Sequence, residues 1–133
     1  MSPRGLFTFR KDERLVGKLL IDRLFRGGES RSLSSYPLRV VYCLAERQAD
    51  GIPVKVMVSV PKRCFKHAVD RNRVKRQLRE AYRHHKAVLW NVMEAHPDKM
   101  LALVFLWLDA SHRTSSEVEQ RIIGLIHRVS EKI

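Results

Sequence analysis

Cysteine is scarce in this sequence, and no residue pattern typical of a metal site involves its six histidines. Cys43 and Cys64 stand far apart, outside any CxxC or Cys/His spacing, which indicates neither a disulfide framework nor a zinc site. We predict two reduced cysteines. His84 and His85 are neighbours that point in different directions on a helix, and no HExxH motif is present. We therefore expect no catalytic histidine and no metal ligand.

Glycine-rich loops and long apolar runs are missing as well. Gly27-Gly28 lacks the pattern of a nucleotide-binding loop. The longest apolar run, residues 100–108, is far shorter than the roughly 20 residues of a membrane helix. The start of the chain, residues 1–5, has no apolar stretch or cleavage site of a secretory signal. We expect a cytoplasmic protein without membrane contact.

Acidic residues are few, and the basic residues are clustered. The chain has 14 Asp and Glu against 26 Lys and Arg, a net charge of +12. Ten of the basic residues lie in residues 62–86 against Asp70 and Glu80 alone, so this segment carries +8. A dense polyanion is the partner to expect. The acidic residues, such as Glu94 and Asp98, are too dispersed to indicate a two-metal nuclease site.

A chain of 133 residues with 44% hydrophobic content suits one compact domain, residues 1–133, with residues 1–11 expected to be a flexible N-terminal segment. The spacing of the apolar residues and the positions of turn-forming residues predict a helix over residues 12–26 and a polar loop over 29–35. They also predict strands over 38–44 and 54–60. A helix from Arg71 to about Glu94, a strand over 100–108 covered on both faces, and a final helix follow.

Several details of these elements can be predicted. Asp12 is placed to cap the first helix, and Gly27-Gly28 to stop it. The turn-rich residues 46–51 favour antiparallel pairing of the strands that flank them. The residues placed on the outer side of these two strands, or at an edge, are Arg39, Lys55 and Ser59. A capping box at Ser116 and Glu119 begins the last helix, whose inward residues are Val118, Ile122, Leu125, Ile126 and Val129.

The basic helix has two distinct faces. Arg71, Lys75 and Arg79 recur at i, i+4 and i+8, whereas an apolar stripe lies on another side. The stripe consists of Val74, Leu78, Ala81 and Tyr82. With Arg71 and Arg73 in the first turn, where the helix dipole favours anions, the helix N-terminus is expected to form a phosphate site. The alternative to a binding site is a basic helix face that is simply solvated.

Residues 58–82 closely resemble the signature of the bacterial ribonuclease P protein subunit. That family shows a strand with small residues, a Lys/Arg pair, an alanine, and then Arg-Asn-Arg-x-Lys-Arg-x-x-Arg. Every element is present here, the last of them over residues 71–79. Residues 14–28 and 37–42 resemble the family's first helix and first long strand. The later helix, strand and helix occur in the expected order.

The resemblance implies an α/β (α+β) two-layer sandwich of order α-β-β-β-α-β-α. This fold is similar to a ribosomal-protein domain, with a left-handed β-α-β crossover through the Arg-Asn-Arg segment. The pattern of the residues alone gives only α-β-β-α-β-α, so the additional strand is expected near Ser32 to Ser35. General topology rules favour a right-handed connection, so the left hand rests on the resemblance.

The implied activity is that of an endoribonuclease: a ribonucleoprotein that removes the 5′ leader of precursor tRNA, with Mg²⁺-dependent chemistry performed by the RNA subunit. By resemblance, the residues that bind this RNA are Lys62, Arg63, Arg71, Asn72, Arg73, Lys75, Arg76 and Arg79. The family also holds the single-stranded leader in a cleft between its first helix and the sheet. The residues that fall near this cleft are Ile21, Phe25, Tyr36 and Tyr42, for which core packing is the alternative.

Three other classes compete with this hypothesis. A DNA-binding regulator could place the basic helix in the major groove, but no preceding helix at helix-turn-helix spacing and no dimer element are apparent, so DNA is not expected as a partner. A ribosomal protein is also small and basic, and would cofractionate with ribosomes. A nuclease composed of protein alone would need a carboxylate cluster, which the sequence does not indicate.

Overall fold

The computed structural model describes residues 9–26 and 28–133 of the chain. In chain order its elements are the 3₁₀ turn η1 (Lys11–Glu13), α1 (Lys18–Arg26), β1 (Arg31–Ser35), β2 (Leu38–Glu46), β3 (Val54–Ser59), α2 (Ala68–His85), α3 (Ala87–Met93), β4 (Lys99–Trp107) and α4 (Ser115–Lys132). The additional strand near Ser32 to Ser35 is confirmed as β1. The predicted helix from Arg71 to Glu94 is two helices in the structure, because the helical hydrogen bonding is interrupted at Lys86.

The four strands form one sheet in the order β1-β2-β4-β3. β2 pairs antiparallel with β1 and with β4, whereas β3 pairs parallel with β4. The predicted hairpin between residues 38–44 and 54–60 is therefore wrong. β4 is apolar on both faces and almost wholly buried, so its place is inside the sheet between β2 and β3.

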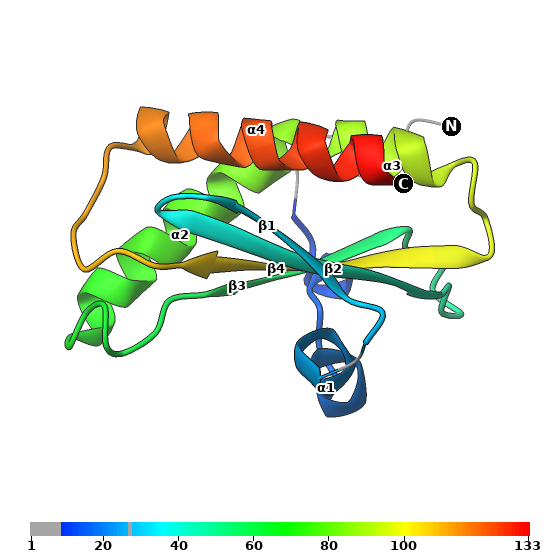
Figure 1. Ribbon diagram of the computed structural model, residues 1–133, viewed down its shortest axis with the longest axis horizontal. Coiled ribbons are helices and arrows are strands. Elements are labelled where there is room, and N and C mark those ends of the chain that lie inside the picture. Colours follow the sequence, from blue (N-terminus) through cyan, green and yellow to red (C-terminus); the bar gives the residue numbers. More distant parts are fainter. Residues whose placement is uncertain (1–8, 27) are drawn as a thin grey trace.

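Helices cover both faces of the sheet, as Figure 1 shows. α2, α3 and α4 pack on one face around the larger core, and α1 packs on part of the other face around a smaller one. The predicted two-layer packing is thus present, with α1 added as a partial third layer. The parallel strands β3 and β4 are joined through α2 and α3, and the left hand of this connection stays a prediction.

The first helix begins six residues later than predicted, at Lys18 instead of Asp12. The reason is that Leu15 N–H donates to the carbonyl oxygen of Val56 in β3 (2.9 Å), which extends the sheet edge. Gly17 then adopts a φ of 106°, a conformation outside any right-handed helix. α1 ends at Arg26, just before the predicted stop at Gly27-Gly28, of which Gly27 lies outside the described residues.

The N-terminal segment makes specific contacts in its described part. The ring of Phe9 packs edge-on against Tyr82, with centroids 5.5 Å apart. Glu13 is completely buried. The flexibility expected for residues 1–11 stays a prediction, and residues 1–8 lie outside the described part of the chain.

The final helix has the predicted inward face but a different cap. All five predicted apolar residues of α4 are buried. The N-cap is Thr114, not Ser116, because its hydroxyl accepts from Glu117 N–H (3.1 Å). None of the helices in residues 9–26 and 28–133 is long and apolar enough to cross a membrane.

The three polar residues expected on the outer face of the sheet share that face. Arg39 is exposed and Ser59 is half-buried. Lys55 is buried instead of exposed, because its ammonium group donates to Gln48 and Asp50 (2.7 Å to the Asp50 carboxylate). Ion pairing and hydrogen bonds compensate for its burial.

Candidate nucleic-acid interface

α2 presents its basic side chains because its apolar stripe is buried as predicted. Val74, Leu78, Ala81 and Tyr82 lie in the larger core. Burial of a side chain such as Val or Leu stabilises the fold by about 1.5–3 kcal/mol, so the rotation of α2 about its axis is fixed by packing. Burial also raises the pKa of the Tyr82 hydroxyl, which accepts a hydrogen bond from Trp90 Nε1 (3.3 Å).

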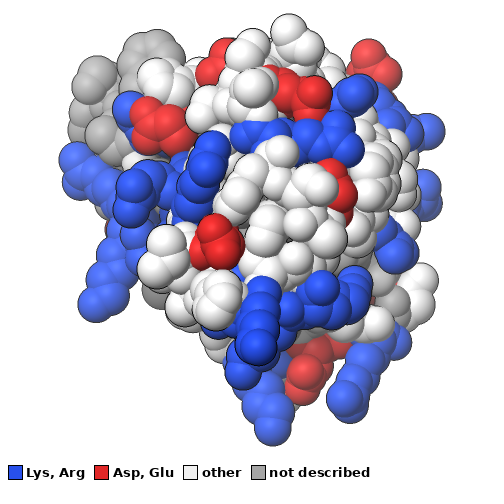
Figure 2. Space-filling model, turned by 90° about the vertical axis from the view of Figure 1, so that its left-hand side faces the viewer, with Lys and Arg blue, Asp and Glu red and all other residues white. Residues whose placement is uncertain are grey.

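The structure brings the eight predicted RNA-binding residues together on α2 and the turn before it. Asn72, Arg73 and Arg76 are exposed, and Arg71, Lys75 and Arg79 are half-buried beside them. Lys62 and Arg63 are exposed in the turn that follows β3. Figure 2, which views the end of the molecule where α2 begins, shows Lys and Arg in several groups with Asp and Glu interspersed.

The predicted placement of Arg71 and Arg73 in the first turn of the helix is wrong, and the phosphate site expected there stays a prediction without that support. α2 begins at Ala68, so Asp70 lies in the first turn and satisfies the dipole there. Arg71 turns back and donates to the carbonyl oxygens of Phe65 (2.9 Å) and Lys66 (3.0 Å). Arg71 thus fixes the turn before the helix, while Arg73, two residues further along α2, is exposed.

Lys86, the last cation of the basic segment, is not available to a polyanion. Its ammonium group is buried and donates to the Glu13 carboxylate at 2.6 Å. It also lies over the Trp90 ring, 4.5 Å from the centroid. Glu13 in turn accepts from Arg10 N–H (3.0 Å). This buried pair joins η1 to the break between α2 and α3, and no local sequence pattern indicates it.

Arg14, which follows Glu13, adds a cation beside α2. Burial and the nearby positive charge of Arg14 lower the pKa of Arg79. Like charges held close to one another repel, so a phosphate between them would relieve the repulsion. Arg83 is a contrast, because its guanidinium is paired with Glu80, which raises the pKa of Arg83 and lowers that of Glu80.

A groove lies between α1 and the outer face of the sheet. Its volume is about 360 Å³, and its lining residues are Leu24, Phe25, Ser30, Arg31, Ser32, Arg39, Val41 and Leu106. The Phe25 side chain is 49% exposed, enough for a planar ligand to reach its ring. Arg39 donates to the Ser32 hydroxyl (3.2 Å), which lays its guanidinium across β1. The groove combines an aromatic ring with cations.

The four residues predicted for a leader cleft do not all meet there. Phe25 lines the groove, and Ile21 is half-buried against the smaller core beneath the same helix. Tyr42 is wrongly assigned to the cleft, because strand alternation directs it to the opposite face, into the larger core. Tyr36 lies in the turn after β1, 57% exposed, with the Arg113 guanidinium 5.6 Å from its ring centroid.

The pattern of the sequence only partly predicted the groove. The alternation in β2 predicted that Arg39 is on the outer face, but its partner Ser32 lies on a strand that the pattern missed. Among residues 9–26 and 28–133, no group of three or more His, Cys, Asp or Glu could hold a metal ion. The carboxylates therefore do not fit a Mg²⁺ site built by the described part of the protein.

These features define a class: a small, strongly basic α+β domain with a cationic helix and a separate groove lined by an aromatic ring and arginines. The sequence model of the family described as Ribonuclease P matches residues 9–130. The chain therefore belongs to the ribonuclease P protein family.

Relatives of known identity agree with this assignment. The ribonuclease P protein component of Porphyromonas gingivalis is 42% identical over 94 residues, which cover 71% of this chain and 66% of that protein. The component of Chlorobaculum tepidum is 38% identical over 112 residues, 80% of this chain and 71% of that protein. The chain thus matches about two thirds of the length of these relatives.

Solved structures show the same fold. The RNase P protein of Staphylococcus aureus superposes with a TM-score of 0.65 at 17% identity, covering 90% of this chain and 95% of that one. The protein of Thermotoga maritima gives 0.62 at 21% identity, covering 86% and 96%. Together with the four-stranded sheet, these structures confirm the predicted α+β class.

Proposed function

We propose that this chain is the protein subunit of a cytoplasmic ribonuclease P. It binds the catalytic RNA through the basic face of α2 and the preceding turn, and it binds the 5′ leader of precursor tRNA in the groove beside α1. The observation that carries the proposal is the placement of exposed Arg73 and Arg76 on one side of a helix whose other side is fixed in the core.

In this proposal, two separate surfaces of the protein, the basic face of α2 and the groove beside α1, bind different RNA partners. Phosphate neutralisation along α2 supplies affinity for structured RNA, and it is insensitive to base sequence. The groove offers the Phe25 ring for base stacking, and Arg39 for a phosphate. A protein that holds both partners fixes the leader relative to the RNA and so positions the scissile bond.

The catalytic groups belong to the RNA in this proposal. Mg²⁺ supplies the activation of water and the neutralisation of developing charge, and it is held by RNA and substrate. The described residues of the protein provide no carboxylate cluster for it. Their part is to bind, orient and neutralise phosphate charge.

The first prediction concerns Phe25. Phe25→Ala is expected to weaken binding of leader-bearing precursor tRNA by about fivefold or more, because base stacking on an aromatic ring contributes about 1–3 kcal/mol. Binding of mature tRNA, which has no leader, should not change. Both affinities are measured with the protein assembled on its RNA subunit.

Leu19→Ala is the matched control, because Leu19 lies on the same helix but is 88% exposed and does not line the groove. It should bind both tRNAs like the wild type. Equal weakening of precursor and mature tRNA by Phe25→Ala would reassign Phe25 to packing of α1.

The second prediction concerns the division of labour. Purified protein without RNA is expected not to cleave precursor tRNA, whereas adding the RNA subunit at low Mg²⁺ concentration should give rapid cleavage at the mature 5′ end. Gel analysis of labelled precursor measures both. Sustained cleavage by nuclease-free protein alone would refute the proposal, and tighter binding to duplex DNA than to the catalytic RNA would favour a DNA-binding regulator.

A further inference from the structure

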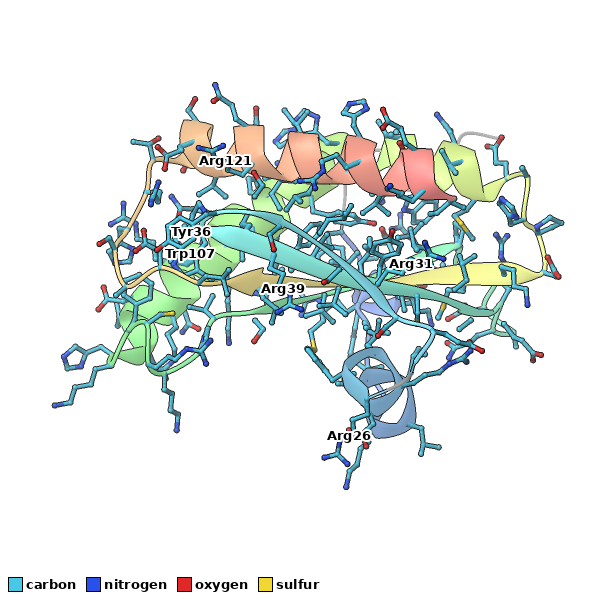
Figure 3. The ribbon with its side chains drawn as sticks, in the orientation of Figure 1. Arg26, Arg31, Tyr36, Arg39, Trp107 and Arg121 are labelled. Atoms are coloured by element: carbon cyan, nitrogen blue, oxygen red, sulfur yellow. The ribbon has the colours of Figure 1, made fainter. Side chains whose placement is uncertain are left out.

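A second set of cations lies on the side of the molecule away from α2, along the sheet edge formed by β1. We call this set the edge band, and its residues are Arg31, Arg39, Arg121, Arg128 and Lys132. All five are exposed. Figure 3 shows Arg31, Arg39 and Arg121 on β1, β2 and α4, and Tyr36 in the turn after β1.

The cations of α4 share one side of that helix. Arg121, Arg128 and Lys132 follow one another at spacings of seven and four residues, which places them on a common stripe. The stripe runs beside β1, because Arg128 donates to the carbonyl oxygen of Ser34 (2.8 Å). The same contact covers part of the open edge of the sheet.

The edge band is continuous with the groove beside α1. Arg31 lines that groove, and it also lines a second hollow of about 220 Å³ that reaches Lys132 and Ile133 at the end of α4. Arg39 lies across β1 from the stripe, since Ser34, the partner of Arg128, is also opposite Arg39 in the strand register. A strand that leaves the groove past Arg31 or Arg39 would therefore next meet the cations of α4.

Two acidic residues at this side are already paired, whereas Glu131 is exposed beside Lys132 on α4. Glu29, in the second hollow, accepts from Arg23 (3.0 Å), and Glu117 on α4 accepts from Arg113 (2.8 Å). Arg113 also lies against the exposed Tyr36 ring, at the far end of β1. The edge band thus keeps its positive charge and has an aromatic ring at its boundary, as single-strand binding surfaces do.

We propose that the edge band binds the phosphates of the leader upstream of the part held in the groove, so that the leader path crosses β1 and continues along α4. This inference rests on the proposed function. It assigns to α4 a role in binding long leaders that is separate from the RNA-binding face of α2. Single-stranded RNA is the occupant because the band extends a groove suited to unpaired bases.

The test compares precursor tRNAs with a short leader of about 4 nucleotides and a long leader of about 12, within the span of single-strand sites. Since Arg128 also holds β1, the variant is Arg121→Gln with Lys132→Gln. Assembled with the RNA subunit, it should bind the long-leader precursor about tenfold more weakly than the wild type. The plot of log affinity against log salt should flatten by about 1.4 for two lost contacts.

Lys18→Gln, which removes an exposed charge from the start of α1, is the control and should leave both affinities unchanged. An equal effect of the double variant on both leaders, or no effect on the long one, would overturn the edge-band proposal while the groove stands. If the wild type binds leader-bearing and mature tRNA equally, the groove proposal fails, and the edge band fails with it.

Discussion

Replacing Lys86 with methionine is expected to lower the free energy of unfolding by about 3–5 kcal/mol, the cost of leaving one member of a buried ion pair alone. Lys86 Nζ and the Glu13 carboxylate are 2.6 Å apart, and both side chains are almost completely buried. Methionine has a similar length, so the loss of stability is caused by the missing charge and not by a cavity. Urea unfolding followed by circular dichroism measures it.

A second substitution separates the ion pair from packing. Glu13→Gln in the Lys86→Met background removes the unpaired charge but retains an oxygen for Arg10 N–H. We expect this double variant to recover most of the lost stability. If Lys86→Met alone is as stable as the wild type, the pair does not fix η1 to the end of α2.

The double substitution Arg73→Ala/Arg76→Ala is expected to produce the largest loss of affinity for the catalytic RNA. Both side chains are exposed on α2, where they can reach phosphates directly. Each lost phosphate contact should flatten the plot of log affinity against log salt by about 0.7–0.9, so two should flatten it by about 1.4–1.8. A salt titration of binding to the RNA subunit gives this slope.

Arg83→Ala provides the comparison on the same helix. Its guanidinium is paired with Glu80, so its removal should change the salt dependence much less. Circular dichroism should show unchanged folding for the Arg73/Arg76 variant, because neither side chain is buried. A wild-type slope in the Arg73/Arg76 variant would contradict direct phosphate contact.

Patterns within single elements predicted much of this molecule. The 3.6-residue period of residues 74–82 predicted which side of α2 is buried. Alternation in β2 predicted that Arg39 faces outward. These predictions succeed because helix and strand geometry convert sequence spacing directly into direction.

The predictions that fail concern how segments meet. Residues 38–44 and 54–60 have the local pattern of a hairpin, but insertion of β4 between them buries a strand that is apolar on both faces. Asp12 has the chemistry of a cap, but pairing of Leu15 with β3 delays the helix to Lys18. In each case a long-range contact outweighs a local preference.

The sequence by itself determined a basic, amphipathic helix and a family signature around Arg71. Only the tertiary structure decided that Tyr42 lies in the core while Phe25 lines a groove, and that Lys86 is neutralised by a residue 73 positions away. Local spacing sets the direction of a side chain on its own element. Its neighbours depend on the free energy of packing the whole chain, to which every element contributes.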